Sequence, residues 1–415
     1  MKILIKILNI TIVFILLCSS LVFADIEDEE IIEVLELNKE VIEASADMYD
    51  EPIINSRSAV IFDRNSKKAL YNKNMNSRRP MASTTKIMTA IVVLENSNLK
   101  DVVKVSKKAA GTGGSSLKLK TNDEVSVENL LYGLMLVSGN DAAVALAEHI
   151  AGSVEGFARL MNAKAEELKL ENTHFVTPHG LDEEEHYTTA YELAILADYA
   201  LKIPKFAEIV GTKTYTVKIN NTPKIISNTN ELLGNISGVY GVKTGFTNGA
   251  NRCLVSSAKR RDLDIICVVL GADTKKDRTR DSIKLIEYSF QNFEVFNIKE
   301  KLEEDFNSWK NINEKRIVVN KGVRSNPKLE LEKLPYEKIA IKKGEENNIR
   351  IQIENSNNFE APLEEKTKIG FIKCYINETE QFEVQILNKE LIEKKNVLDY
   401  FIELLQKYNF CSKLN

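Results

Sequence analysis

The stretch MASTTKIMTA, residues 81–90, places a polar cluster directly before a run of apolar residues. Ser83 stands one helical turn before Lys86, and the segment that follows, IMTAIVVLE, has almost no polar side. A helix that is apolar all round is buried in a protein core. The stretch therefore predicts a buried central helix with a hydroxyl and an amine at its N-terminal end.

Two interpretations of this pair are open. In the first, Ser83 caps the helix and Lys86 extends its ammonium group to solvent. In the second, burial lowers the pKa of Lys86, and the neutral amine takes the proton of a serine nucleophile. The spacing alone does not decide, because a serine precedes a lysine by three residues at four other places: Ser97, Ser115, Ser256 and Ser325.

The surrounding segments predict an α/β domain over residues 51–295. SAVIFDRNSKKALYNKN, from Ser58, has the pattern of a β-hairpin. Residues 128–170 are mostly helical in pattern, residues 215–272 are rich in strand patterns, and TRDSIKLIEYSFQNF is typical of a closing helix. Strands at both ends with helices between them indicate one domain whose two ends share an antiparallel sheet.

Two segments precede this domain. Residues 1–24 carry Lys2 and Lys6, then an apolar core and a small-residue exit at Ala24, which predicts a signal peptide. A retained membrane anchor is the alternative. Residues 25–50 are acidic and are interpreted as a linker or a pro-segment.

Two segments follow it. Residues 296–390 contain short alternating runs separated by polar turns, which predict a small all-β sandwich domain. Residues 391–415 predict an amphipathic helix that attaches to the membrane surface, with packing against the β domain as the alternative. Its apolar stripe consists of Val397, Phe401, Leu404, Leu405 and Tyr408.

Composition excludes some classes of function. The 415 residues are 43% hydrophobic and 28% charged, which fits two or three globular domains. A formal net charge of -4 without a basic block argues against nucleic acid as a partner. Neither the four histidines nor the cysteines have the spacing of metal ligands. Cys253 and Cys267 lie on successive predicted strands, and both a disulfide and two buried free thiols are open.

Two further motifs carry polar groups into apolar surroundings. In LVSGNDAAVALAEHI, Ser138 and Asn140 interrupt a helical pattern, either to line a cleft or as a helix–helix turn capped by Asn140. In VYGVKTGFTNGANRCLVSSA, Lys243 and Thr244 offer a cation and a hydroxyl to a carboxylate, and Gly245 leaves room for a substrate backbone. The alternative is a hairpin edge with a solvated lysine.

Together the three motifs are far more specific than any one. S-x-x-K, Ser-x-Asn and K-T-G, in this order, are the set of class A β-lactamases and penicillin-binding proteins. With RPMASTTKIMTA, GGSSLKLK, THFVTPHGLD and HYTTAYELA, the chain resembles the low-molecular-mass penicillin-binding proteins, which are serine-type D-alanyl-D-alanine carboxypeptidases. The likeness is strongest over residues 55–295. It implies the β-lactamase/transpeptidase-like α/β fold, an antiparallel sheet with helices on both faces.

The resemblance also implies a role for each motif residue. Ser83 is the expected nucleophile, Lys86 its general base, and Ser138 and Asn140 complete the proton network. Lys243, Thr244 and Gly245 are expected to bind the substrate, and the backbone N–H groups of Ser83 and Phe246 to form the oxyanion hole.

The implied reaction removes the terminal D-alanine from peptidoglycan pentapeptides through an acyl-enzyme. It takes place outside the cytoplasmic membrane, β-lactams are covalent inhibitors, and no cofactor or metal takes part.

Two other functions are weighed against this reading. A β-lactamase needs a glutamate-held water, and PHGLDEEEHYTT, which contains residues 183–185, follows the carboxypeptidase pattern instead. A catalytically silent penicillin- or peptidoglycan-binding protein is expected to lose a motif, and none is lost. Two departures bear on substrate preference, because Thr229 replaces an arginine of some relatives and Tyr240 stands where an acidic residue is common.

Overall fold

The structure is a computed structural model that describes residues 36–41 and 51–411, with side chains as far as residue 406. The expected signal peptide, residues 1–24, and most of the acidic segment 25–50 lie outside the described residues. The chain divides into two compact units, Met1–Asn292 and Phe293–Asn415.

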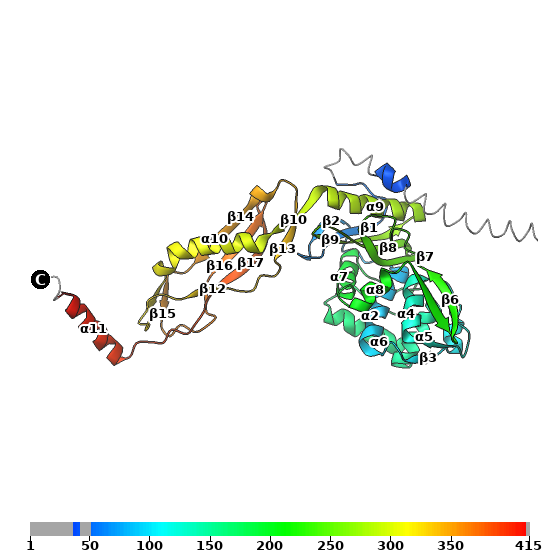
Figure 1. Cartoon of the computed structure of the whole chain (residues 1–415), viewed down its shortest axis with the longest axis horizontal. Helices are drawn as coiled ribbons and strands as arrows, with labels where there is room; N and C mark the ends of the chain where they lie inside the picture. The colour runs from blue at the N-terminus through cyan, green and yellow to red at the C-terminus, as the bar shows by residue number, and fades with distance from the viewer. Residues whose placement is uncertain (1–35, 42–50, 412–415) are drawn as a thin grey trace, which may run out of the picture. The chain divides into compact units, whose positions relative to one another are not determined.

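Five antiparallel strands form the sheet of the first unit, in the order β2-β1-β9-β8-β7 (Figure 1). They are β1 (Ser58–Asp63), β2 (Ala69–Lys73), β7 (Val239–Thr247), β8 (Asn251–Arg260) and β9 (Leu263–Ala272). The early hairpin joins the late strands through β1 and β9, where Val60 lies opposite Val268. The expectation of one sheet shared by both ends is confirmed, and β7, which carries K-T-G, is an edge strand.

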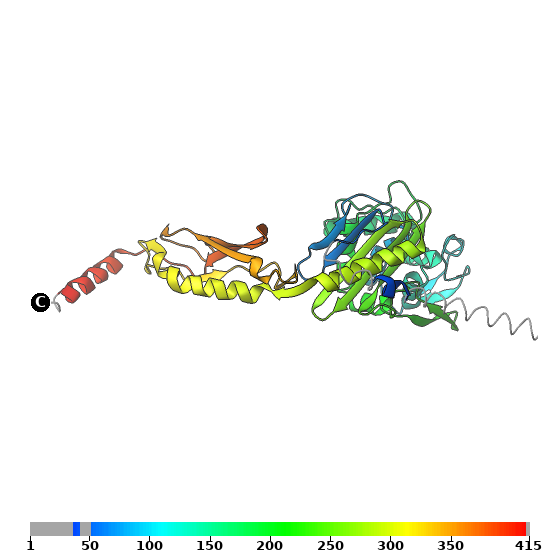
Figure 2. The same ribbon diagram turned by 90° about the horizontal axis from the view of Figure 1, so that it is seen from above.

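Helices cover both faces of this sheet, as expected (Figures 1 and 2). The closing helix α9 (Lys275–Asn292) packs on β8 and β9. The helices of the opposite side are α2 (Lys86–Asn96), α4 (Val127–Leu136), α5 (Asn140–Ala151), α6 (Val154–Glu167), α7 (Ala190–Ala200) and α8 (Pro204–Val210). The shorter elements are η1 (Ala82–Thr85), β3 (Val102–Lys104), α3 (Lys107–Ala110), β4 (Glu124–Ser126), β5 (Thr214–Ile219) and β6 (Thr222–Ser227).

Helix α2 is the centre of the core of the first unit. Its side chains Ile87, Met88 and Ile91 are inaccessible to solvent, and the helix contacts α4, α5, α6 and α7. Each such side chain stabilises the fold by about 1.5–3 kcal/mol through burial. The N-terminal end of α2, and with it Lys86, is therefore held by rigid surroundings.

A short part of the acidic N-terminal segment packs against the first unit. Residues 36–41 are helical, and Leu37 and Val41 are buried. Glu40 lies 3.7 Å from Arg280 of α9. These six residues are therefore part of the folded unit, which the interpretation as a linker did not include.

Cys253 and Cys267 are free cysteines, and both are buried, as is Cys374. In the ladder between β8 and β9, Cys267 lies opposite Ser256 and not opposite Cys253. A disulfide between Cys253 and Cys267 is therefore absent, because the two side chains are not cross-strand neighbours.

The second unit is rich in β-strands, as expected. One sheet has the order β12-β17-β16-β14, and the pairs β10-β13 and β11-β15 form two small sheets. The strands are β10 (Phe293–Asn297), β11 (Val318–Asn320), β12 (Leu329–Leu331), β13 (Lys338–Lys342), β14 (Ile349–Asn355), β15 (Asn358–Glu360), β16 (Lys368–Ile376) and β17 (Thr379–Asn388). The helical elements are α10 (Ile298–Asn313), η2 (Glu314–Arg316), η3 (Glu346–Asn348) and α11 (Val397–Cys411).

The helix α10 was not expected in a domain predicted to be all-β. Asn297 caps it by accepting a hydrogen bond from the backbone N–H of Glu300. Ile298, Leu302 and Phe306 follow at intervals of four residues and are buried. This helical period with an asparagine cap explains the element. Part of the core of the second unit is therefore made by a helix packed against strands.

Candidate active site

Ser83 lies in the 3-10 turn η1, which leads directly into α2. The hydroxyls of Thr84 and Thr85 donate to the carbonyls of Met81 and Ala82, at 2.6 and 2.7 Å. No side chain caps the start of α2. The interpretation of Ser83 as a helix cap is therefore wrong, and its hydroxyl has a different partner.

That partner is Lys86, whose Nζ donates to Ser83 Oγ at 2.9 Å. Lys86 Nζ also donates to Asn140 Oδ1 at 2.8 Å and to the carbonyl oxygen of His179 at 2.7 Å. The side chain is completely buried, so it does not extend to solvent. Burial first, and then the charge of Lys243, hold the pKa of Lys86 well below its ordinary value. The lowered pKa favours a neutral amine, which can donate to the carbonyl oxygens of Asn140 and His179 and accept from the hydroxyl of Ser83.

Asn140 joins Lys86 to the loop between α3 and β4. Its side chain accepts from Lys86 and donates through Nδ2 to the carbonyl oxygen of Gly113 at 2.7 Å. Its neighbour Asp141 accepts from the backbone N–H groups of Leu117 and Leu119 at 2.9 and 3.0 Å. Asn140 opens α5 without a side-chain capping bond, so this motif is more than a helix–helix turn.

Ser138 lies in the connection between α4 and α5. It has a φ of +59° and is buried. Its Oγ has no hydrogen-bond partner among the residues that the structure describes. A buried hydroxyl without a partner is costly, and in an enzyme it is a candidate contact for a substrate or for a proton in transit.

Lys243 and Thr244 come from the edge strand β7. Lys243 is 1% exposed, so it is not a solvated lysine. Burial, together with the charge of Arg278, lowers its pKa to about 7. The hydroxyl of Thr244 lies 2.8 Å from the hydroxyl of Thr229, the residue that replaces an arginine of some relatives. A carboxylate bound here would restore the charged form of Lys243.

Gly245 brings β7 against the nucleophile turn. A Cβ on this residue would lie 3.2 Å from the backbone N of Ser83 and 3.2 Å from the Cβ of Ala82. Glycine is therefore the residue that lets the strand approach η1 this closely. Three motifs that lie 160 residues apart in sequence, from Ser83 to Lys243, meet around one hydroxyl.

The next residue on β7 is Phe246, whose side chain is 47% exposed. The guanidinium of Arg252 lies over its ring at 3.7 Å. The expected contribution of Phe246 is its backbone N–H, which follows the close approach of Gly245 to Ser83 along the strand. That role stays a prediction.

Two residues beside the site were not found from the sequence. His179 supplies the backbone carbonyl that accepts from Lys86, and a backbone atom leaves no signal in residue type. Arg278 of α9 is 3% exposed, forms an ion pair with Glu231 and contributes to the lowered pKa of Lys243. In sequence it belongs to an ordinary helical pattern, so only the packing of α9 on β8 and β9 reveals it.

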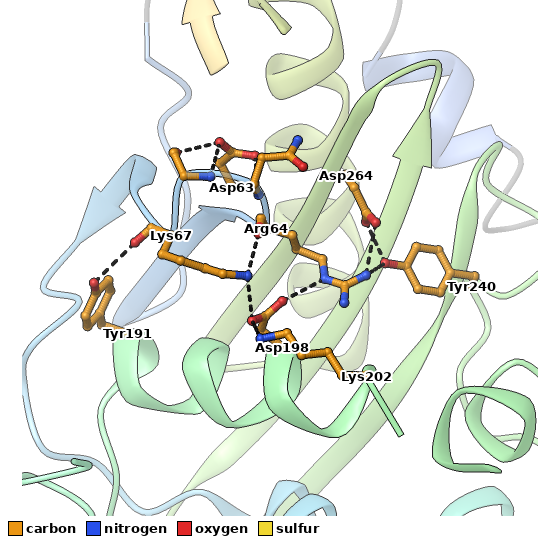
Figure 3. Close-up of polar contacts among 10 residues, drawn as sticks. Asp63, Arg64, Lys67, Tyr191, Asp198, Lys202, Tyr240 and Asp264 are labelled. Carbon is orange, nitrogen blue, oxygen red and sulfur yellow. Dashed lines mark hydrogen bonds and ion pairs between the residues drawn. The ribbon is translucent and has the colours of Figure 1, made fainter. Parts of the chain in front are cut away.

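Tyr240, the second departure noted in the sequence, belongs to a cluster behind the start of β7 (Figure 3). Its hydroxyl donates to Asp264 at 2.5 Å and accepts from Arg64 Nη1 at 2.8 Å. Arg64 also donates to Asp264 and to Asp198, both at 3.0 Å. Tyr240 thereby ties β7 to β9, to α7 and to the turn after β1, and it does not add a carboxylate to the site.

Comparison with known proteins identifies relatives that match most of the chain. A family model described as D-alanyl-D-alanine carboxypeptidase matches residues 45–274. The D-alanyl-D-alanine carboxypeptidase DacF of Bacillus subtilis is 38% identical over 322 residues, 76% of this chain and 80% of the relative. DacA of Haemophilus influenzae is 35% identical over 77% of this chain and 80% of its own length. The crystal structure of penicillin binding protein 5 from Haemophilus influenzae superposes with a TM-score of 0.70 at 30% identity, over 84% of this chain and all of that chain.

Proposed function

The chain belongs to the D-alanyl-D-alanine carboxypeptidase family, and on that premise we propose a catalytic role for each residue around Ser83. The enzyme is a serine-type D-Ala-D-Ala carboxypeptidase, a hydrolase that acts on peptidoglycan and is a target of β-lactams. The β-lactamase and the silent binding protein are not favoured. The assignment of individual residues is our proposal.

Acylation begins with proton transfer from Ser83 Oγ to the neutral Nζ of Lys86. The alkoxide attacks the carbonyl carbon of the penultimate D-alanine, and the N–H groups of Ser83 and Phe246 stabilise the oxyanion. Collapse of the tetrahedral intermediate breaks the peptide bond and forms the ester on Ser83. The proton passes from Lys86, through the hydroxyl of Ser138, to the amine of the departing D-alanine. The Oγ of Ser138, which has no hydrogen-bond partner within the part of the chain that the structure describes, supports this path.

Substrate binding depends on the carboxylate of the terminal D-alanine. Lys243 and Thr244 hold this carboxylate, and Asn140 orients Lys86 and the peptide. Deacylation then adds water to the ester, with Lys86 as general base, and releases the shortened peptide. A β-lactam acylates Ser83 in the same way. Its amine cannot depart, because it stays joined to the acyl group after the ring opens, and it blocks the path of water.

The observation that carries this proposal is the 2.9 Å contact between Ser83 Oγ and the Nζ of Lys86, whose side chain is completely buried. Intact-mass spectrometry after incubation with benzylpenicillin should give one adduct per chain, and Ser83→Ala should abolish it. Ser97→Ala and Ser256→Ala serve as matched controls, because each removes a serine that also precedes a lysine by three residues. Release of D-alanine from a pentapeptide should follow the same pattern. An adduct that persists in Ser83→Ala would overturn the assignment.

We further propose that α11 attaches the extracytoplasmic enzyme to the membrane surface. Val397, Phe401 and Leu404 are 87%, 57% and 66% exposed, so this face does not pack against the rest of the second unit. Asn396 caps the helix by accepting from the N–H groups of Leu398 and Asp399. Tyr408 lies beyond the described side chains. Within residues 36–41 and 51–411, no helix is long and apolar enough to cross a membrane. Attachment in the interface plane fits these features.

A truncation after Lys395 tests the attachment. The truncated protein should no longer sediment with phospholipid vesicles, while its reaction with benzylpenicillin stays unchanged. Phe401→Glu should weaken sedimentation in the same way, and Gln406→Glu, which adds the same charge outside the apolar stripe, should not. Continued sedimentation of the truncated chain would contradict the proposal.

A further inference from the structure

The loop that carries His179 is linked to the end of β7 by the side chain of Asp182. Asp182 Oδ1 accepts from the hydroxyl of Thr247 at 2.5 Å, and Oδ2 accepts from the backbone N–H of Gly249 at 3.0 Å. Thr247 is the last residue of β7, and Gly249 lies in the turn to β8.

The two segments that Asp182 joins both touch the nucleophile turn. On one side, the carbonyl of His179 accepts from Lys86, and a Cβ on Gly180 would lie 1.9 Å from the carbonyl oxygen of Ala82. On the other side, Gly245 approaches the backbone N of Ser83. The turn η1 is therefore held between two walls, the loop and the strand.

Strand β7 needs such a link because it is an edge strand of the sheet. Hydrogen bonds to β8 hold one side of β7 only. The turn beyond Thr247 is short, and the Thr247 hydroxyl also accepts from the N–H of Ala250 at 3.1 Å. The hydroxyl of Thr247 thus closes the turn between β7 and β8, and through Asp182 it also joins this turn to the loop that carries His179.

We propose that Asp182 is a positioning residue that fixes the distance between the two walls and so aligns the backbone N–H of Phe246 with that of Ser83. The proposal rests on the oxyanion hole of the proposed function. Asp182 acts through the backbone of β7 and touches no reacting atom. Loss of the link shifts the last residues of β7, and a shift of about 1 Å in a catalytic group costs on the order of 100-fold in rate.

The test measures the second-order rate constant for acylation by benzylpenicillin, together with the number of adducts per chain at saturation. Asp182→Ala should lower the rate constant about 10- to 100-fold and still reach one adduct per chain. Thr247→Val removes the hydroxyl at nearly constant volume and should have a similar effect, whereas Thr247→Ser keeps the hydroxyl and should stay close to the parent. The double variant Asp182→Ala/Thr247→Val should be no slower than the slower single variant, because both changes break one link.

A third variant opens the link without removing the carboxylate. A Cβ on Gly249 would lie 2.9 Å from Asp182 Oδ1, so Gly249→Ala should also slow acylation. Glu183→Ala and Asn248→Ala, exposed neighbours on the two segments, are the controls and should leave the rate constant unchanged.

Acylation of Asp182→Ala at the parent rate would overturn the proposal. So would a number of adducts per chain that falls in proportion to the rate, since that result reports unfolded protein. If the parent chain forms no adduct, or if the adduct survives Ser83→Ala, the proposed function fails and not the role of Asp182.

Discussion

At the scale of single residues, the site contains two lysines whose pKa values are lowered by burial. Lys86 and Lys243 are both completely or almost completely buried, and both have lowered pKa values. Their roles require opposite protonation states. In the proposed mechanism, Lys86 accepts a proton and must be neutral, whereas Lys243 binds a carboxylate and must be charged.

The pH dependence of acylation follows from this opposition. The rate constant for benzylpenicillin should rise as the pH passes the pKa of Lys86, because the neutral base appears. It should fall as the pH rises through the pKa of Lys243, about 7 in the free enzyme, because the cation is lost. The expected profile is a bell, measured by stopped-flow or quenched-flow acylation.

The variant Lys243→Arg separates the two limbs of this profile. A guanidinium stays charged throughout the accessible range, so the alkaline limb should disappear while the acid limb stays. Lys243→Arg is also expected to acylate more slowly overall, because arginine does not reproduce the geometry of the ammonium group. An alkaline limb of unchanged position in this variant would show that another group causes it.

At the scale of elements, the position of β7 is held at its start and at its end. The start depends on Tyr240, Arg64 and Asp264, and the end on the link to Asp182. Between them lie Lys243 and Gly245. The K-T-G strand is thus an edge strand with few main-chain partners. Side chains from other elements hold it in place on the side where it has no neighbouring strand.

The cluster at the start of β7 predicts a stability change that depends on pH. Arg64→Ala leaves the carboxylates of Asp198 and Asp264, 6% and 18% exposed, without their shared partner. Asp198 keeps its pairs with Lys67 and Lys202, and Asp264 keeps the bond from Tyr240, so we expect a loss of about 1.5–3 kcal/mol in the free energy of unfolding at neutral pH. Lys67→Ala removes a lysine that is 45% exposed from the same Asp198 and should cost less than about 1 kcal/mol.

The sign of the pH effect follows from Asp198. Although burial opposes it, bonds from Lys67, Lys202 and Arg64 hold the pKa of Asp198 below its ordinary value. The stability from this carboxylate is therefore present above the unfolded-state pKa and is lost as the pH falls. Urea unfolding at neutral and at acid pH should show that the difference between Arg64→Ala and the parent shrinks on acidification. An equal difference at both values would contradict this account.

At the scale of the whole molecule, the two units have separate cores. The residues proposed for catalysis lie between Ser83 and Phe246, within the unit that ends at Asn292. Its core cluster contains α2, α4, α5 and the sheet, whereas Leu302, Phe306 and Ile372 belong to a cluster of the second unit. This division indicates that the catalytic unit folds without the second one.

A chain that ends at Asn292 tests this independence. It should unfold cooperatively and react with benzylpenicillin at a rate within about twofold of the full chain, because no proposed catalytic residue is removed. Thermal unfolding and the acylation rate constant provide the measurements. Acylation more than about tenfold slower in a chain with a cooperative transition would show that the second unit shapes the site.

The sequence alone determined the elements whose patterns are local. The apolar run after Lys86, the hairpin after Ser58 and the alternation in the late strands predict the helix and the sheet, because burial on one face or on all faces leaves a period in the residues. The three motifs, through their resemblance to a known family, also indicated the reaction. The alternating runs around α10 predict a β domain, and they do not reveal this helix although its apolar residues are spaced by four.

Tertiary structure decided what no local pattern contains. The alternatives for Ser83, Lys86 and Lys243 were a cap and two solvated ammonium groups, and only the packing of α5, β7 and the His179 loop around α2 excluded them. Other groups near the site come from residues that are far from Ser83 in the sequence. They are the carbonyl of His179, the guanidinium of Arg278 and the carboxylate of Asp182. Their contacts depend on how elements pack, and packing sums many weak interactions over residues that are far apart along the chain.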